Sequence, residues 1–154
     1  MLYKKYLLYL LMFLTGMLSF HLPVAAGTAG YAGNGGRRAH ATPYLYAGEA
    51  LQLTQYLLSA NGKFILLLTP NGNLKLYIRD TGAVLWETRT AGLGVYEARL
   101  NTSGSLGLHG INGYLFWTSG TFGYPTSYLY LQDDGNLVLS YYAVVVWSTN
   151  TGGH

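Results

Sequence analysis

From residue 64 onward, apolar and polar residues alternate along short segments that are separated by small polar turns. Three stretches share one order of features: a strand-like segment, a turn (Asn-Gly-Asn, Ser-Gly-Ser or Asp-Gly-Asn), an alternating strand, and an apolar segment that ends in Trp. The tryptophans, Trp86, Trp117 and Trp147, recur about every 30 residues. This period indicates an internal repeat, with units at about 64–94, 95–124 and 127–154.

Each unit is predicted to be a meander of three antiparallel strands, because a glycine in each first turn supplies the backbone freedom of a tight hairpin. Alternation places leucines on one face of each meander. One meander cannot bury that face, but three around an axis can. We expect the three tryptophans to fill the shared centre as core residues rather than to stack on sugars. Residues 44–58 contain one further alternating segment, which would add a fourth strand to one sheet. Helical periodicity is lacking, so the chain is predicted to be all-β.

The composition supports strands joined by turns. Half of the 154 residues are apolar, 21 are Gly and 15 are Tyr, whereas only 10% are charged; a typical soluble domain has about 25% charged residues. These values exclude a disordered charged tail and disfavour a helical bundle. Without Cys, the chain has no disulfide, thiolate metal site or Cys nucleophile.

Residues 1–26 have the pattern of a signal peptide. Lys4 and Lys5 form its positive region, an apolar run follows, and Val24-Ala25-Ala26 supplies the small residues of a cleavage site. An uncleaved signal anchor is the alternative, although the apolar run is short of the roughly 20 residues of a spanning helix. Residues 27–43 are Gly-rich and are predicted to be a linker. We therefore expect a secreted, extracellular protein without membrane contact after cleavage, or a cell-surface protein if the leader is retained.

The remaining charges and histidines give no support to nucleic-acid binding, metal binding or catalysis. Without the two leader lysines, 7 of the 9 basic residues face 6 acidic ones, so the basic patch that nucleic-acid binding needs is missing. The histidines lack metal-ligand spacing. Asp133 and Asp134 are neighbours on a strand pattern and would point to opposite faces, unlike a glycosidase pair. We therefore expect no cofactor, no metal and no catalytic residue, and hence no enzyme.

The third unit carries a group of polar residues at alternating positions: Gln132, Asp134, Asn136 and Val138. Period two places them on the face opposite the leucines. The carboxylate can accept hydrogen bonds from two hydroxyls, the amides both donate and accept, and the valine methyls would cover a C–H patch. This set suits a sugar ring with vicinal hydroxyls.

The pattern QxDxNxV in tandem units of about 30 residues, with WSTNTGG at 147–153, resembles the bulb-type mannose-binding lectins of monocot plants (the B-lectin domain) and their bacterial and fungal relatives. The resemblance covers residues 44–154. It implies a β-prism II of three four-stranded antiparallel sheets with pseudo-threefold symmetry. It also implies binding of α-mannose in glycans without a metal, and a possible homodimer formed through the C-terminal strand.

The sequence also departs from the family. The family motif ends in Tyr where this chain has Ser140, followed by Tyr141 and Tyr142, which a one-residue bulge could bring near the site. The first unit retains a weaker candidate site with Lys75 at the apolar position; its residues are Asn71, Asn73 and Tyr77. The second unit has side chains too short to surround a sugar and is predicted to be inactive; they include Asn101, Ser103, Ser105, Gly107 and His109.

Two functions follow from these observations. The first is a secreted, non-enzymatic lectin that recognises terminal α-mannose mainly through the third repeat. The alternative is the same fold serving as a protein-binding, structural or bacteriocin-like module whose sugar sites have decayed, since two of the three sites depart from the motif.

Overall fold

The computed structural model describes residues 42–154. The predicted signal peptide and residues 27–41 of the predicted linker lie outside the described residues. All regular secondary-structure elements of the described residues are β-strands, which confirms the all-β prediction. No helix there is long and apolar enough to cross a membrane.

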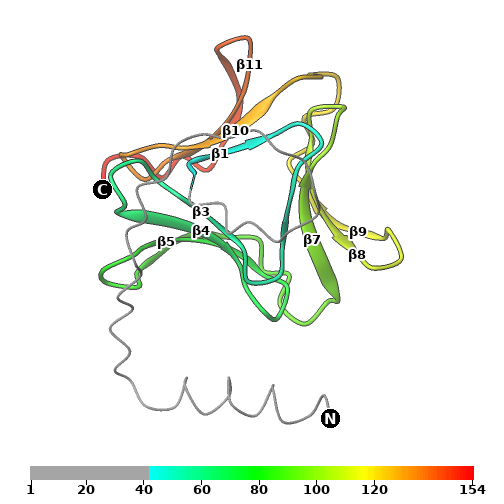
Figure 1. Cartoon of the computed structure of the whole chain (residues 1–154), viewed down its shortest axis with the longest axis horizontal. Coiled ribbons are helices and arrows are strands. Elements are labelled where there is room, and N and C mark those ends of the chain that lie inside the picture. The colour runs from blue at the N-terminus through cyan, green and yellow to red at the C-terminus, as the bar shows by residue number, and fades with distance from the viewer. Residues whose placement is uncertain (1–41) are drawn as a thin grey trace, which may run out of the picture. The chain divides into compact units, whose positions relative to one another are not determined.

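Twelve strands form three antiparallel four-stranded sheets, which lie around a common centre in Figure 1. The first sheet has the order β3 (Tyr56–Leu58), β4 (Phe64–Leu68), β5 (Leu74–Ile78), β6 (Val84–Glu87). The second has the order β2 (Ala50–Gln52), β7 (Val95–Leu100), β8 (Leu106–Gly110), β9 (Leu115–Thr118). The third has the order β1 (Tyr44–Tyr46), β10 (Tyr128–Leu131), β11 (Leu137–Tyr141), β12 (Val144–Ser148). Three meanders and three sheets confirm the predicted β-prism.

Residues 44–58 were predicted to add one strand to one sheet, and the structure differs from this prediction. The segment divides into β1, β2 and β3, and each of these pairs with the first strand of a different meander. Two tight turns divide it, closed by hydrogen bonds from Glu49 N to Tyr46 O and from Gln55 N to Gln52 O, both 2.9 Å. Every sheet therefore gains its fourth strand from this one segment.

Leucines from all three sheets form one core. The middle residue of each N-terminal strand is a leucine with no exposed surface: Leu45, Leu51 and Leu57. The leucines of each meander, predicted to share one face, join them in the same cluster. We call this buried side the inner face of each sheet and the opposite side its outer face.

The three tryptophans contact one another in an edge-to-face triangle beside this core. Their ring centroids lie 5.6, 5.7 and 6.0 Å apart, and each pair of rings is inclined by more than 70°. Each Trp lies opposite a buried leucine of the neighbouring strand. One additional residue, Leu85, Phe116 or Val146, bulges from each last strand directly before its Trp.

Candidate functional site

The turn between β10 and β11 carries the polar residues of the third unit. Gln132 N donates to Asn136 O at 2.8 Å, and Gly135 N donates to Gln132 O at 3.2 Å. Asp134 Oδ1 accepts the backbone N–H of Asn136 at 2.9 Å. Among residues 42–154, neither Asp134 Oδ2 nor the side-chain amide of Gln132 has a hydrogen-bond partner. The turn thus fixes the carboxylate through one oxygen and leaves the other free.

The C-terminal segment holds this turn from the other side. Asn136 Oδ1 accepts hydrogen bonds from Thr149 Oγ1 at 3.1 Å and from Thr151 N at 3.2 Å. Thr151 Oγ1 donates to Gly135 O at 2.8 Å, and Gly153 N donates to Asp134 O at 3.0 Å. Asn136 Nδ2 makes no hydrogen bond within the described chain. The carbonyl half of this amide therefore anchors the turn, and the amino half is available.

Asp133 serves the fold and not the exposed site. Its Oδ1 accepts the N–H of Asn61 at 2.7 Å, and its carbonyl oxygen accepts Asn61 Nδ2 at 2.9 Å. These bonds tie the site turn to the β3–β4 turn of the first sheet. The adjacent carboxylates of Asp133 and Asp134 thus have separate partners.

Val138 lies on the outer face as expected, but it is only 4% exposed, and Ser140 is only 5% exposed. The sequence predicted valine methyls open to a ligand. Instead, tyrosines occupy this face: Tyr130 lies opposite Val138 and Tyr128 lies opposite Ser140. Little of Val138 is therefore available to a sugar ring.

These tyrosines belong to a stack. The ring of Tyr44 stacks on Tyr130 with centroids 4.6 Å apart and on Tyr46 with centroids 6.0 Å apart. Burial raises the pKa of the Tyr130 phenol, and the neighbouring Tyr44 and the carboxylates of Asp133 and Asp134 raise it further. An aromatic surface thus borders the polar turn.

The bulge beside Ser140 lies in β12 and not in β11. Ser140 pairs with Val145 while Leu139 pairs with Trp147, so Val146 is the additional residue. Alternation along β11 is therefore continuous. Tyr141 accordingly follows on the other face, where its ring contacts that of Tyr124 at 5.5 Å.

In the first unit, the side chain of Asn73 is occupied by the fold. Asn73 is 3% exposed, and its Oδ1 accepts hydrogen bonds from Thr88 Oγ1 and Thr90 N, as Asn136 does from its threonines. Its Nδ2, however, donates to Glu87 Oε2 at 2.9 Å. Glu87 also forms an ion pair with Lys75 at 3.4 Å. Asn73 was expected to take part in a weaker sugar site; in this structure its Oδ1 and one N–H of its Nδ2 are bonded within the first unit.

The other two residues of that weaker site have different surroundings. Asn71 is exposed, and its Oδ1 accepts the hydroxyl of Thr69 at 2.6 Å. Tyr77 is half-buried on the outer face, where burial, with a smaller effect of Tyr56, raises the pKa of its phenol. The first unit thus does not bring three free polar groups together.

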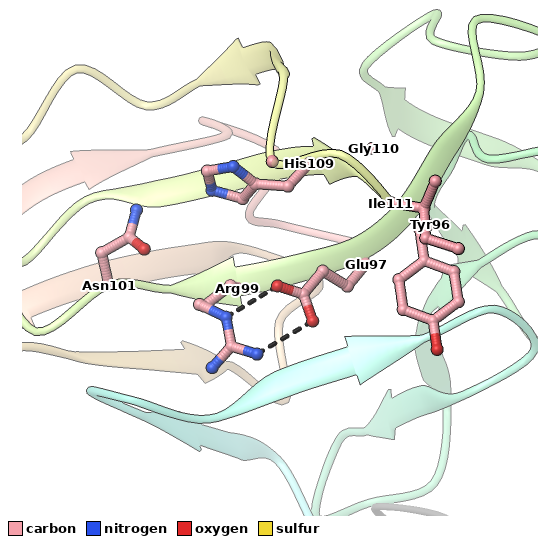
Figure 2. A pocket seen from close by; sticks show the side chains of 8 residues that line it. Tyr96, Glu97, Arg99, Asn101, His109, Gly110 and Ile111 are labelled. Carbon is pink, nitrogen blue, oxygen red and sulfur yellow. Dashed lines mark hydrogen bonds and ion pairs between the residues drawn. The ribbon is translucent and has the colours of Figure 1, made fainter.

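The second unit lacks the motif but has a pocket on its outer face. Ser105 is buried and shares hydrogen bonds with the hydroxyls of Thr118 and Ser119. The pocket has a volume of about 330 Å³, and Figure 2 shows the Glu97–Arg99 pair within it. Hydrogen bonds from Arg99 lower the pKa of Glu97, against the opposing effect of burial. Sequence reasoning missed both residues, because they belong to β7 and not to the motif strand.

Residues 42–154 hold no group of three or more His, Cys, Asp or Glu side chains that would suit a metal ion. No protein-family model and no curated protein matches the chain.

Several solved structures match this chain. A lectin from Japanese Marasmius oreades is 27% identical with a TM-score of 0.65, and the match covers 71% of this chain and 92% of that one. A monomeric monocot mannose-binding lectin from Gastrodia elata is 25% identical with a TM-score of 0.64, with coverage of 72% and 99%. The mannose-specific agglutinin of snowdrop (Galanthus nivalis) bulbs is 30% identical with a TM-score of 0.59, with coverage of 73% and 99%.

These neighbours share the β-prism of three four-stranded sheets. They are lectins, which are non-enzymatic proteins that bind carbohydrate. The match to the snowdrop agglutinin, at 30% identity, extends over 99% of that protein. The chain therefore belongs to the bulb-type lectin family of the monocot mannose-binding lectins.

Proposed function

We propose that this protein is a secreted lectin that binds terminal α-mannose of glycans through its third unit. One contrast carries the proposal. The amino group of Asn136 and one oxygen of Asp134 are free, whereas the equivalent amino group of Asn73 is bonded to Glu87. Two neighbours support the ligand: the snowdrop agglutinin is described in complex with methyl-α-D-mannoside, and a Polygonatum cyrtonema lectin in complex with monomannoside.

The proposed contacts follow from the free groups. Asp134 Oδ2 accepts from a sugar hydroxyl, Asn136 Nδ2 donates to a hydroxyl oxygen, and the Gln132 amide can do either. A hydrogen bond to a charged group contributes about 1.5–3 kcal/mol net. Because the floor over Val138 is largely covered, polar contacts dominate. A single site of this kind has a dissociation constant on the order of 1 mM, or roughly −4 kcal/mol.

Useful avidity then requires several copies of the site. We propose a homodimer as one way to supply them. In the single chain, β12 pairs with β11; exchange of this strand between two chains would preserve those bonds.

The test is retention of the Asp134→Asn variant on a mannose column. Asn keeps the Oδ1 acceptor that caps the turn through Asn136 N but removes the negative charge. We expect that the variant is not retained on the column, so that it elutes before free mannose is added. Its unfolding midpoint should stay unchanged. Asp80→Asn is the matched control, since Asp80 is 82% exposed and lies in the first unit; it should be retained. Retention of Asp134→Asn would reject the third-unit site.

The alternative module with decayed sugar sites is favoured by one observation, the occupied amide of Asn73. A glycan array separates the two functions. Mannose signals that free mannose competes away support the lectin, whereas a blank array together with a protein captured in a pull-down supports the alternative.

A further inference from the structure

The second unit contains an acceptor sequence for N-linked glycosylation. Asn101, Thr102 and Ser103 match the sequon Asn-x-Ser/Thr, in which x is any residue except proline. No other asparagine among the 154 residues is followed two positions later by serine or threonine. Acceptors of this kind lie in surface loops of secreted proteins. The sequence therefore offers one position for an N-linked glycan.

This acceptor lies in an exposed turn. Asn101 directly follows β7 and is half-buried. Its backbone closes the turn to β8: Asn101 N donates to Ser105 O, and Gly104 N donates to Asn101 O, both at 2.9 Å. Thr102 and Ser103 are exposed, and neither side chain makes a hydrogen bond within residues 42–154. The fold thus uses the backbone of this turn and leaves the side chains of the sequon to solvent.

The side-chain amide of Asn101 also differs from those of the other asparagines in the described residues. Its oxygen and its nitrogen both lack a hydrogen-bond partner there. All other described asparagines use the side-chain amide in at least one hydrogen bond of the fold: Asn61, Asn71, Asn73, Asn112, Asn136 and Asn150. A glycan on Asn101 Nδ2 therefore breaks no hydrogen bond, so the one asparagine in a sequon is also the one that the fold leaves free.

The outer face of the second sheet has open space beside this amide. Asn101 lies on that face, since it alternates with the buried Leu100, and Figure 2 shows it at one end of the pocket there. A Cβ at Gly107 would lie 3.4 Å from Asn101 Nδ2, so the nitrogen stands beside a residue without a side chain. The other units have Lys75 and Val138 at the position of Gly107. An attached sugar thus extends over an open surface.

We propose that Asn101 carries an N-linked glycan. The donor is an oligosaccharide whose anomeric carbon is joined to a lipid diphosphate. Asn101 Nδ2 forms a bond to that carbon, the bond from the carbon to the diphosphate oxygen breaks, the lipid diphosphate leaves with the electron pair, and Nδ2 loses one proton. The proposal rests on the proposed secretion, because the transfer takes place in the secretory pathway. It is independent of sugar binding by the third unit.

The glycan also meets a need of this part of the chain. No Lys or Arg follows Arg99, and the acidic residues after it are Asp133 and Asp134. Large apolar side chains are nevertheless exposed there, among them Ile111 at 86% and Tyr142 at 76%. Charged surface residues keep proteins soluble, and an attached glycan is bulky and solubilising. The glycan thus supplies solubility where the sequence supplies little charge.

The test is production of the full chain in a eukaryotic host that attaches N-linked glycans, once with its own leader and once with a host leader placed before it. Intact mass is measured before and after peptide-N-glycosidase, which leaves aspartate at the glycosylated position. We expect a mass loss in both forms and aspartate at position 101. Protein secreted without a glycan under the host leader would overturn the acceptor site. Failure of secretion with the chain's own leader alone would overturn the proposed secretion, so the two failures are distinguishable.

Two substitutions of Ser103 assign the modification to this sequon. Ser103→Ala removes the sequon and Ser103→Thr keeps it, and both leave unchanged the Ser103 carbonyl that accepts the N–H groups of Gly123 and Tyr124. We expect the mass loss to disappear in Ser103→Ala and to persist in Ser103→Thr. A glycan on Ser103→Ala, or none on Ser103→Thr, would refute the assignment. Urea midpoints of the glycosylated and enzyme-treated parent should agree, and a lower midpoint with the glycan would contradict the open space beside Asn101.

Discussion

Gly135 is the point where the site turn packs against the first sheet, and replacing it with alanine tests that contact. Gly135 has a φ of +89°, and an added Cβ would lie 2.7 Å from Phe64 Cε1 and 3.0 Å from Phe64 Cζ. Phe64 has no exposed surface, so its ring cannot move into solvent. The substitution therefore combines backbone strain with overlap in the core.

The two contributions have separate magnitudes. An L-residue in the left-handed region costs about 1–2 kcal/mol, offset by about 0.4–1 kcal/mol because alanine restricts the unfolded chain. Overpacking of a core costs typically about 1–3 kcal/mol. Gly135→Ala should therefore lower the free energy of unfolding by about 1–4.6 kcal/mol. Gly82→Ala is the matched control, because Gly82 has a φ of +69° and nothing within 4 Å of the added Cβ.

Urea unfolding followed by tryptophan fluorescence measures both variants. We expect Gly135→Ala to shift the midpoint clearly further than Gly82→Ala at an unchanged slope. Adding Phe64→Leu to Gly135→Ala should cost less than the two single changes summed, because the smaller side chain relieves the overlap. Equal destabilisation by Gly135→Ala and Gly82→Ala would refute the contact between the site turn and Phe64.

Two further predictions concern pH and a turn. Hydrogen bonds from Arg99 hold the pKa of Glu97 below its usual 4.5, so they stabilise the fold above that pH and this stabilisation is lost as the pH falls through the lowered pKa. Urea midpoints at pH 7 and at pH below 4.5 should therefore differ less in Glu97→Gln than in the parent; an unchanged difference contradicts this. Tyr142 and Ala143 join β11 and β12 with φ values of 45° and 65°, a geometry that favours Gly. Ala143→Gly should raise the free energy of unfolding by about 0.5 kcal/mol, the strain relieved less the entropy of the unfolded chain, and a lower midpoint would count against this.

The repeated meanders were predictable because their causes are local. A glycine turn and a period-two pattern of leucines act within about 30 residues, and three copies reinforce one another. The division of residues 44–58 into three strands was not predictable from periodicity, since strands of three residues are too short to show it. The six-residue spacing of Leu45, Leu51 and Leu57 was the available indication.

The sites were less predictable because the partner of each polar group comes from another strand. Asn73 and Asn136 stand at equivalent positions in the sequence, but Glu87 reaches the amide of Asn73 through the pairing of β5 with β6. The pocket of the second unit depends on the bulge at Tyr96, which alternation does not reveal. Residue type located the candidate groups, and strand pairing decided which of them are free.

In the first and third units, we predict that the residue after the tryptophan determines whether the amino group of the motif asparagine is free for a ligand. Ser148 pairs with Val138 as Glu87 pairs with Lys75. Ser148→Glu should therefore place a carboxylate beside Asn136 Nδ2, abolish retention on a mannose column and leave all motif residues unchanged. Ser148→Ala is the control and should be retained, since it removes only two bonds with Asn150, the one that Ser148 Oγ donates to Asn150 Oδ1 and the one that it accepts from Asn150 N. If the folded Ser148→Glu protein still bound mannose as the parent does, the free amino group of Asn136 would not be what distinguishes the third unit from the first.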